Sequence, residues 1–268
     1  STGVIGEPIP VEIVKSNLDY LIKSLDREAY TDAANAILTT DLKVKQIAYQ
    51  AVLGGRRISI GGMAKGSGMI HPSMATMLSY ITCDAGLEYT LWSEMIKRVA
   101  ASSFNAITVD GDTSTNDTFL AFSSGPKLDP KYLTHLEEGL HLTAQHLAKA
   151  IARDGEGANC LLEIKVEGAQ SNLDAHAIAR TIASSSLVKT AVNGSDPNWG
   201  RIIAALGRSG IIFNFNEVQL WIGPYEIFSN GKPHDFDRQT VSNFMKDRLN
   251  GKYLVDDLIS IKLIVGLG

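Results

Sequence analysis

The sequence predicts an α+β protein, because two kinds of apolar pattern occur along it. In some segments apolar residues recur every three or four positions, as in amphipathic helices, and in others they alternate, as in strands. The 268 residues suffice for one large domain or two ordinary ones, and 44% hydrophobic and 20% charged residues are typical of globular proteins. The pattern of apolar residues changes near Ala158, from a long helical segment to strand-like alternation. We therefore predict one domain over residues 1–158 and a second over 159–268.

The first part contains four predicted helices and four predicted strands. Helical periodicity predicts helices over residues 10–25, 32–38, 89–104 and 133–152. Short apolar runs predict strands over residues 47–52, 58–60, 77–82 and 118–122. Gly54 and Gly55 are typical of a tight hairpin turn between the first two strands. We expect the second strand to lead into a glycine-rich loop over residues 61–68.

The second part is predicted to be richer in strands. Alternating or short apolar runs predict strands over residues 162–166, 211–215, 218–222 and 258–265. A helix is predicted between the first two, over residues 173–184.

Charge and composition exclude two classes of partner. The formal net charge is −4 and no cluster of lysine or arginine occurs, which argues against nucleic-acid binding. Residues 66–83 form an uncharged run, but His71, Pro72 and several hydroxyl side chains would be costly in lipid. We therefore expect this run to be the wall of a pocket and expect no membrane contact. Two distant cysteines, Cys83 and Cys160, fit free thiols in a reducing compartment.

The two ends of the sequence indicate a piece of a longer protein. It begins with Ser1 rather than Met and ends in strand-like alternation. We expect a fragment or a processed product with further residues after Gly268.

Two loop motifs match known ligand-binding loops only in part. In the glycine loop Lys65 precedes Gly66, which does not match a phosphate-binding loop. The run from Asp110 to Ser114 resembles the start of a calcium loop but lacks its glycine and its final glutamate, so we favour a polar turn that satisfies its own backbone. Three histidines on the predicted helix over 133–152 are spaced by six and five residues, so we expect them to be solvated and not to bind metal.

The uncharged run contains a threonine with two possible roles. Ala75-Thr76 is flanked by methionines. A threonine that becomes N-terminal by chain cleavage gains a base in its own α-amine, and is then an effective nucleophile. A buried core threonine would give the same local sequence. The residues alone favour this second, structural role.

Eight sequence blocks taken together are more specific. They are Thr2-Gly-Val-Ile-Gly6, Ala36-Ile-Leu-Thr-Thr-Asp41, Gly61-Gly-Met-Ala-Lys-Gly-Ser-Gly-Met-Ile70, Met74-Ala-Thr-Met-Leu78, Asp110-Gly-Asp-Thr-Ser-Thr-Asn-Asp117, Arg153-Asp-Gly-Glu-Gly-Ala158, Val188-Lys-Thr-Ala191 and Asp196-Pro-Asn-Trp-Gly-Arg201. In this order they strongly resemble the ornithine acetyltransferase family, also called glutamate N-acetyltransferase or ArgJ, of the cyclic arginine pathway. The likeness covers nearly the whole chain.

The resemblance implies a fold and a set of site residues. The implied fold is a DmpA/ArgJ-like four-layer αββα domain joined to a smaller α+β C-terminal domain. The implied self-cleavage lies between Ala75 and Thr76 and makes Thr76 the nucleophile. The oxyanion hole would be at Thr2 and Gly3. The implied substrate contacts are Thr39, Lys65, Thr76 and Glu156. Members of the family extend before and after these 268 residues.

The same resemblance implies a reaction and partners. The acetyl group of N2-acetyl-L-ornithine would pass to L-glutamate through an acyl-threonine, with no metal or bound cofactor. Whether acetyl-CoA is a further donor stays open. The cleaved α and β pieces would form an α2β2 assembly, expected in the cytoplasm or in an organelle matrix. Two alternatives are a self-cleaving amidase or aminopeptidase of the same fold and a non-enzymatic binding protein built on the glycine loop.

Overall fold

The computed structural model describes residues 5–71 and 77–267, and it divides the chain into two compact units, Ser1–Glu156 and Gly157–Gly268. The boundary predicted from the sequence lies two residues later, after Ala158. The catalytic and cleavage residues predicted at Thr2, Gly3, Ala75 and Thr76 lie outside the described residues.

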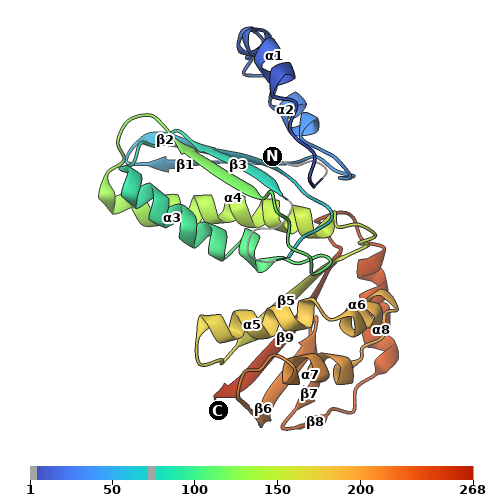
Figure 1. Ribbon diagram of the computed structural model, residues 1–268. Coiled ribbons are helices and arrows are strands. Elements are labelled where there is room, and N and C mark those ends of the chain that lie inside the picture. Colours follow the sequence, from blue (N-terminus) through green and yellow to red (C-terminus); the bar gives the residue numbers. More distant parts are fainter. Residues whose placement is uncertain (1–4, 72–76, 268) are drawn as a thin grey trace. The chain divides into compact units, whose positions relative to one another are not determined.

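The first unit is a four-stranded mixed sheet with helices on one face (Figure 1). Its strands, in the order β1-β2-β3-β4, are β1 (Lys45–Leu53), β2 (Arg56–Lys65), β3 (Leu78–Cys83) and β4 (Thr118–Ser123). The β1–β2 and β2–β3 pairs are antiparallel, and β3–β4 is parallel. Gly54 and Gly55, with φ of 61° and 76°, form the predicted hairpin turn.

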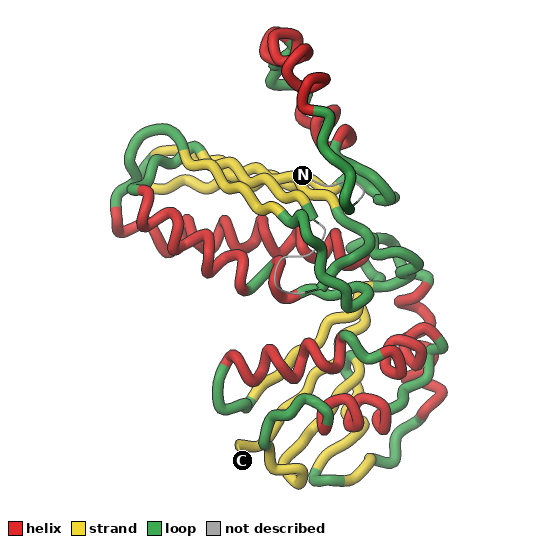
Figure 2. The backbone as a smooth tube through the Cα atoms, in the orientation of Figure 1, coloured by secondary structure: helices red, strands yellow, loops and turns green. Residues whose placement is uncertain are grey.

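Two helices, α3 (Tyr89–Ala101) and α4 (Leu133–Arg153), run along one face of this sheet (Figure 2). Apolar side chains of α4 at three- and four-residue spacing, among them Leu136, Leu140 and Leu147, are buried against β1 and β2. The helix predicted over 89–104 ends earlier, and Phe104 opens the short 3₁₀ helix η1 (Phe104–Ala106). A second short 3₁₀ helix, η2 (Pro130–Tyr132), precedes α4.

Two further helices precede the sheet, α1 (Val11–Lys23) and α2 (Tyr30–Ala36), close to their predicted positions. No side chain of α1 is buried in the described part of the chain. Its apolar residues, such as Ile13 and Leu21, are 63% and 53% exposed.

The predicted glycine loop is partly wrong. Residues 61–65 belong to β2; residues 61–64 are paired with both β1 and β3, and Lys65 is paired with β3. Glycine allows α4 to pack closely here, because a Cβ on Gly62 would lie 2.9 Å from Cδ1 of Leu147 and 3.1 Å from Cγ2 of Thr143. The loop proper starts at Gly66, directly after Lys65.

The second unit is a five-stranded mixed sheet in the order β5-β9-β6-β7-β8. Its strands are β5 (Leu161–Glu167), β6 (Phe213–Ile222), β7 (Tyr225–Ser229), β8 (Lys232–Pro233) and β9 (Leu258–Leu267). The two strands predicted over 211–222 are one strand, β6, whose pairing with β9 shifts between Asn214 and Gln219. The β5–β9 pair is parallel, and the other pairs are antiparallel.

Four helices complete the second unit: α5 (Asn172–Ala183), α6 (Ser186–Asn193), α7 (Trp199–Gly207) and α8 (Arg238–Leu249). They share with the sheet one buried apolar cluster, which includes Ile178, Leu206 and Met245. Only α5 was predicted. Each unit is thus a mixed sheet with packed helices, and the predicted α+β class is confirmed.

Candidate active site

Three of the predicted substrate-binding residues line one cavity in the first unit. Thr39, Lys65 and Glu156 surround a space of about 320 Å³. The remaining lining residues are Thr40, Ser67, Gly68 and Met69. The three come from separate places in the chain: the segment after α2, the end of β2 and the segment after α4. The volume suits a small-molecule ligand.

Lys65 brings a buried positive charge to this cavity. It is the last residue of β2 and is 2% exposed. Its Nζ donates a hydrogen bond to Oγ1 of Thr39 at 3.3 Å, and among the described residues this is its one hydrogen-bond partner. Burial lowers the pKa of the Lys65 ammonium, and the nearby carboxylate of Asp41 opposes this shift.

Glu156 brings the opposite charge. It lies three residues beyond the end of α4, and its backbone N–H donates to the carbonyl of Ser67 at 3.1 Å. A Cβ on Gly68 would lie 2.8 Å from Oε1 of Glu156. Glycine at position 68 therefore leaves room for the carboxylate beside the loop.

Asp41 ties the segment of Thr39 to the loop after β2. Its carboxylate accepts hydrogen bonds from the N–H of Gly66 at 2.7 Å and the N–H of Thr39 at 3.3 Å. Lys45 Nζ lies 2.6 Å from the same carboxylate. Burial disfavours the ionised form, but the Gly66 amide and the Lys45 ammonium outweigh it and lower the pKa of Asp41.

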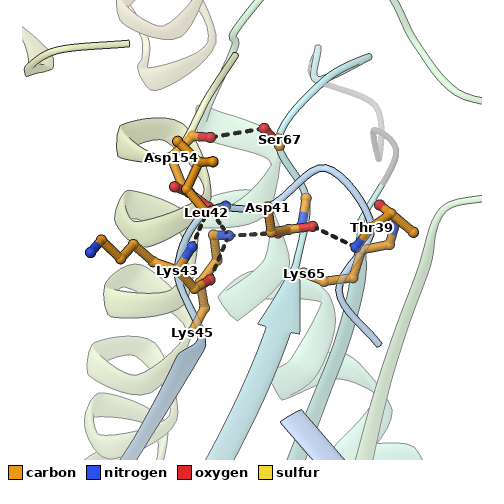
Figure 3. A network of polar contacts seen from close by, with 9 residues as sticks. Thr39, Asp41, Leu42, Lys43, Lys45, Lys65, Ser67 and Asp154 are labelled. Atoms are coloured by element: carbon orange, nitrogen blue, oxygen red, sulfur yellow. Dashed lines mark hydrogen bonds and ion pairs between the residues drawn. The ribbon is translucent and has the colours of Figure 1, made fainter. Parts of the chain in front are cut away.

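A buried ion-pair frame, formed by Asp41, Lys45 and Asp154, holds the walls of the cavity together (Figure 3). Lys45 Nζ also lies 2.6 Å from Oδ2 of Asp154, the residue that caps the C-terminal end of α4. Oδ2 of Asp154 accepts the N–H groups of Leu42 and Lys43 as well. The backbone carbonyl of Asp154 accepts from Oγ of Ser67 at 2.9 Å. One buried cation thus links the three segments that carry Thr39, Lys65 and Glu156.

The polar loop over residues 108–117 contacts the other side of the glycine loop. The two carboxylate oxygens of Asp110 accept the consecutive amides of Met69 and Ile70, at 2.6 and 3.0 Å. These bonds stabilise Met69 in its positive φ of 57°, which is uncommon for a residue with a side chain. The polar-turn interpretation of this motif is therefore incomplete: Asp110 and Ser114 accept the amides of Asp112 and Asn116 within the loop, but Asp110 also accepts two amides of the glycine loop.

Asp117 ends that loop and contacts the residue that follows Thr76. Its Oδ1 accepts the N–H of Met77 at 3.0 Å. Its Oδ2 is buried and has no hydrogen-bond partner in the described chain. Burial raises the pKa of Asp117 to about 6, although the Met77 amide and the positive charge of Lys65 both act to lower it.

Sequence reasoning missed Asp41, Lys45, Asp154 and Asp117 as parts of the site. The burial of Lys45 could have been predicted from its position in β1. It lies two residues before Ile47, so the two side chains are on the same face of the strand, and Ile47 packs against the core. The other three are carboxylates in polar segments, where nothing local indicates burial. Their importance arises from contacts between distant parts of the chain.

The described ranges also bear on metal binding, membrane contact and the histidines of α4. Within residues 5–71 and 77–267 no three histidine, cysteine or acidic side chains are grouped as metal ligands. No helix there has the length and apolar character needed to span a bilayer. The expectation that the α4 histidines are solvated holds for His135 but not for His146, which is half-buried and whose pKa is lowered by burial. His141 is half-buried and hydrogen-bonds to Ser102.

Known proteins of one family resemble this chain over its whole length. The ArgJ family model matches residues 1–267. Proteins named arginine biosynthesis bifunctional protein ArgJ from Prochlorococcus marinus strains NATL2A and MIT 9313 are 83% and 57% identical over the whole chain. The chain spans 64% and 63% of the lengths of these two relatives.

A crystal structure gives the same result for the fold. The structure of the arginine biosynthesis bifunctional protein ArgJ from Bacillus halodurans is 34% identical, with a TM-score of 0.64, over 70% of this chain and 88% of that one. This likeness confirms the predicted fold class. By family model, sequence and structure, the chain belongs to the ArgJ family.

Proposed function

We propose that this chain is the main part of an acetyltransferase that transfers the acetyl group of N2-acetyl-L-ornithine to L-glutamate in arginine biosynthesis. The observation that carries the proposal is the shared cavity of Thr39, Lys65 and Glu156. These residues are the described members of the substrate site that the family resemblance implies. The fold brings them together although they lie far apart in the sequence.

The charges in the cavity fit an amino-acid substrate. A buried ammonium with a single hydrogen-bond partner, as at Lys65, has donors left for a carboxylate of the substrate. Glu156 offers a carboxylate for the ammonium group of the ornithine side chain. N-acetylornithine carries a carboxylate and a side-chain ammonium, and glutamate carries carboxylates and an α-amine. Both substrates can therefore place a carboxylate near Lys65 and a nitrogen near Glu156.

The proposed chemistry uses a threonine that cleavage makes N-terminal. Breaking the bond between Ala75 and Thr76 frees the α-amine of Thr76, which then takes the proton of its own hydroxyl during attack on the acetyl carbonyl. Thr2 and Gly3 stabilise the negative charge on the carbonyl oxygen. Ornithine leaves with the proton that the Thr76 amine took up. The amine of glutamate then attacks the acyl-threonine and loses a proton through the Thr76 amine to the threonine oxygen, so that N-acetylglutamate and the free hydroxyl of Thr76 form. In this reaction no metal or bound cofactor takes part. The two pieces that cleavage produces, α and β, assemble as an α2β2 tetramer.

Product analysis of the full-length protein tests this function. With N-acetylornithine and glutamate, N-acetylglutamate should form much faster than free acetate. If acetate release is equally fast with and without glutamate, the protein is an amidase of the same fold. Assays with acetyl-CoA in place of N-acetylornithine show whether this second donor is used.

A further inference from the structure

Two hydrogen bonds fix the backbone of Glu156 beside the glycine loop. The N–H of Glu156 donates to the carbonyl of Ser67 at 3.1 Å. Oγ of Ser67 donates in turn to the carbonyl of Asp154 at 2.9 Å (Figure 3). Ser67 and Asp154 are both buried, with exposed fractions of 3% and 4%. The segment that carries Glu156 is therefore fixed relative to the loop at the point where Gly68 follows Ser67.

A side chain at position 68 would collide with the carboxylate of Glu156. A Cβ built there would lie 2.8 Å from Oε1, 3.0 Å from Cδ and 3.4 Å from Oε2 of Glu156, and these are the three heavy atoms nearest to it. The first two distances are too short for packed side-chain atoms. Gly68 does not have a positive φ, so its backbone conformation is also open to alanine. The neighbour that a methyl group would displace is therefore the carboxylate.

Gly68 and Glu156 line the same cavity as Lys65. A diamino acid whose carboxylate binds near Lys65 and whose side-chain ammonium binds near Glu156 has to span the separation of these two charges. Each methylene of its side chain changes the reach of the ammonium. Because the backbone of Glu156 is fixed, the place of its carboxylate depends on the size of the residue at position 68.

We propose that Gly68 is a positioning residue that determines substrate length: without a side chain at position 68, the Glu156 carboxylate lies against the loop, where the ammonium of a diamino acid as long as ornithine reaches it. This inference rests on the proposed function, in which Glu156 binds that ammonium. A methyl group on residue 68 moves the carboxylate until the ordinary contact distance of 3.4 Å or more is restored. The site then no longer matches ornithine.

The test measures how the full-length protein ranks three diamino acids of increasing length. Binding of L-2,4-diaminobutyrate, L-ornithine and L-lysine is measured by calorimetry for wild type and Gly68→Ala. We expect wild type to prefer ornithine. In Gly68→Ala its preference over the better-bound of the other two should fall by about tenfold or more, the usual effect of one mismatched methylene.

Gly61→Ala is the matched control. Gly61 lies in β2 of the same glycine-rich segment, and a Cβ there would lie 3.6 Å from Oγ1 of Thr82, an ordinary contact. Gly61→Ala should therefore rank the three diamino acids as wild type does.

A second background separates an effect through Glu156 from a direct contact of the new methyl group with the ligand. Glu156→Asp shortens the side chain by one methylene and withdraws the carboxylate from residue 68. In that background Gly68→Ala should leave the ranking unchanged. Where binding there is too weak for calorimetry, kcat/KM for the three N2-acetylated diamino acids gives the ranking. An equal effect of Gly68→Ala in both backgrounds would overturn the inference.

Two other results would also overturn it. One is a Gly68→Ala protein that binds all three diamino acids as wild type does, or more weakly by one common factor. The other is a Gly68→Ala protein that does not fold, because the backbone would then have moved instead of the Glu156 side chain. The proposed function fails separately, if wild type prefers ornithine in the binding assay but transfers no acetyl group from N-acetylornithine.

Discussion

Lys45 Nζ lies 2.6 Å from Oδ2 of Asp154, although 109 residues separate them in the sequence. Both side chains are almost completely buried, and Asp41 binds the same ammonium. The cation pairs with two buried carboxylates that in turn hold backbone amides around the cavity. The geometry of the site therefore depends on a residue that does not line it.

Replacing this cation should destabilise the protein strongly. Lys45→Met leaves Asp41 and Asp154 buried without a counter-charge, and breaking a buried pair in this way costs about 3–5 kcal/mol in the free energy of unfolding. Urea unfolding monitored by circular dichroism measures the loss. Lys131→Met is the control, because Lys131 pairs with Asp129 on the exposed surface, and its urea midpoint should match that of wild type. Equal midpoints for both variants would show that the ion-pair frame contributes no stability.

Glu156→Gln should weaken substrate binding and leave cleavage intact. Glutamine keeps the shape of the side chain but removes the charge that, in the proposed function, pairs with the ammonium group of ornithine. The expected cost is about 1.5 to 3 kcal/mol, or roughly ten- to a hundredfold in kcat/KM for N-acetylornithine. Glu138→Gln on the exposed face of α4 is the matched control. An unchanged kcat/KM in cleaved Glu156→Gln would make Glu156 a simple turn residue.

Asp117 should make stability depend on pH in a defined window. Its pKa of about 6 in the folded protein exceeds the ordinary value of 3.8, so the folded state binds the proton more tightly than the unfolded state. The contribution of Asp117 to the free energy of unfolding is thus fully present below pH 4 and is lost as pH rises to about 6. Asp117→Asn should remove this dependence and raise the Tm relative to wild type at pH 7.5. A lower Tm for the variant at that pH would contradict the buried-carboxylate account.

Chelation should leave acetyl transfer unchanged. In the proposed reaction the nucleophile, the base and the oxyanion hole are all groups of the chain itself. Prolonged dialysis of the full-length protein against EDTA, followed by the transfer assay with and without added Zn²⁺ or Mg²⁺, measures this. A rate that falls on dialysis and recovers with one of these ions would contradict the proposed mechanism.

The sequence predicts elements whose signals are local. The β1–β2 hairpin follows from Gly54 and Gly55 between apolar runs, and α4 follows from its long apolar periodicity. The helices α6, α7 and α8 were missed because they are short or weakly amphipathic, although Ser185, Asn198 and Asp237 supply typical N-terminal caps.

The site is less predictable because it depends on distant contacts. Gly61 and Gly62 are in a strand because they pair with β1 and β3. Their sequence alone indicates a loop, since glycine is uncommon in strands. Nothing near Asp154 or Asp117 in the sequence indicates that the fold buries these carboxylates. The prediction of Thr39, Lys65 and Glu156 depends on the family resemblance. It assigns the three residues to one substrate site, and so implies that they lie close together.

Thr76→Ala should abolish both cleavage and transfer, because no other side chain provides a hydroxyl together with an N-terminal amine. Thr82→Ala, which removes an exposed threonine of β3, is the control and should be cleaved and active. Intact mass and the transfer assay measure the two properties. Cleavage in Thr76→Ala would place the nucleophile elsewhere.

The central claim is that Thr76 carries the acetyl group between the two substrates. Mass spectrometry of the cleaved full-length protein, mixed with N-acetylornithine in the absence of glutamate and quenched rapidly, tests it most directly. We predict that the piece beginning at Thr76 gains the mass of one acetyl group, located on Thr76 by fragmentation, and loses it when glutamate is added. A piece that stays unmodified while N-acetylglutamate forms at the full rate would contradict the acyl-threonine mechanism.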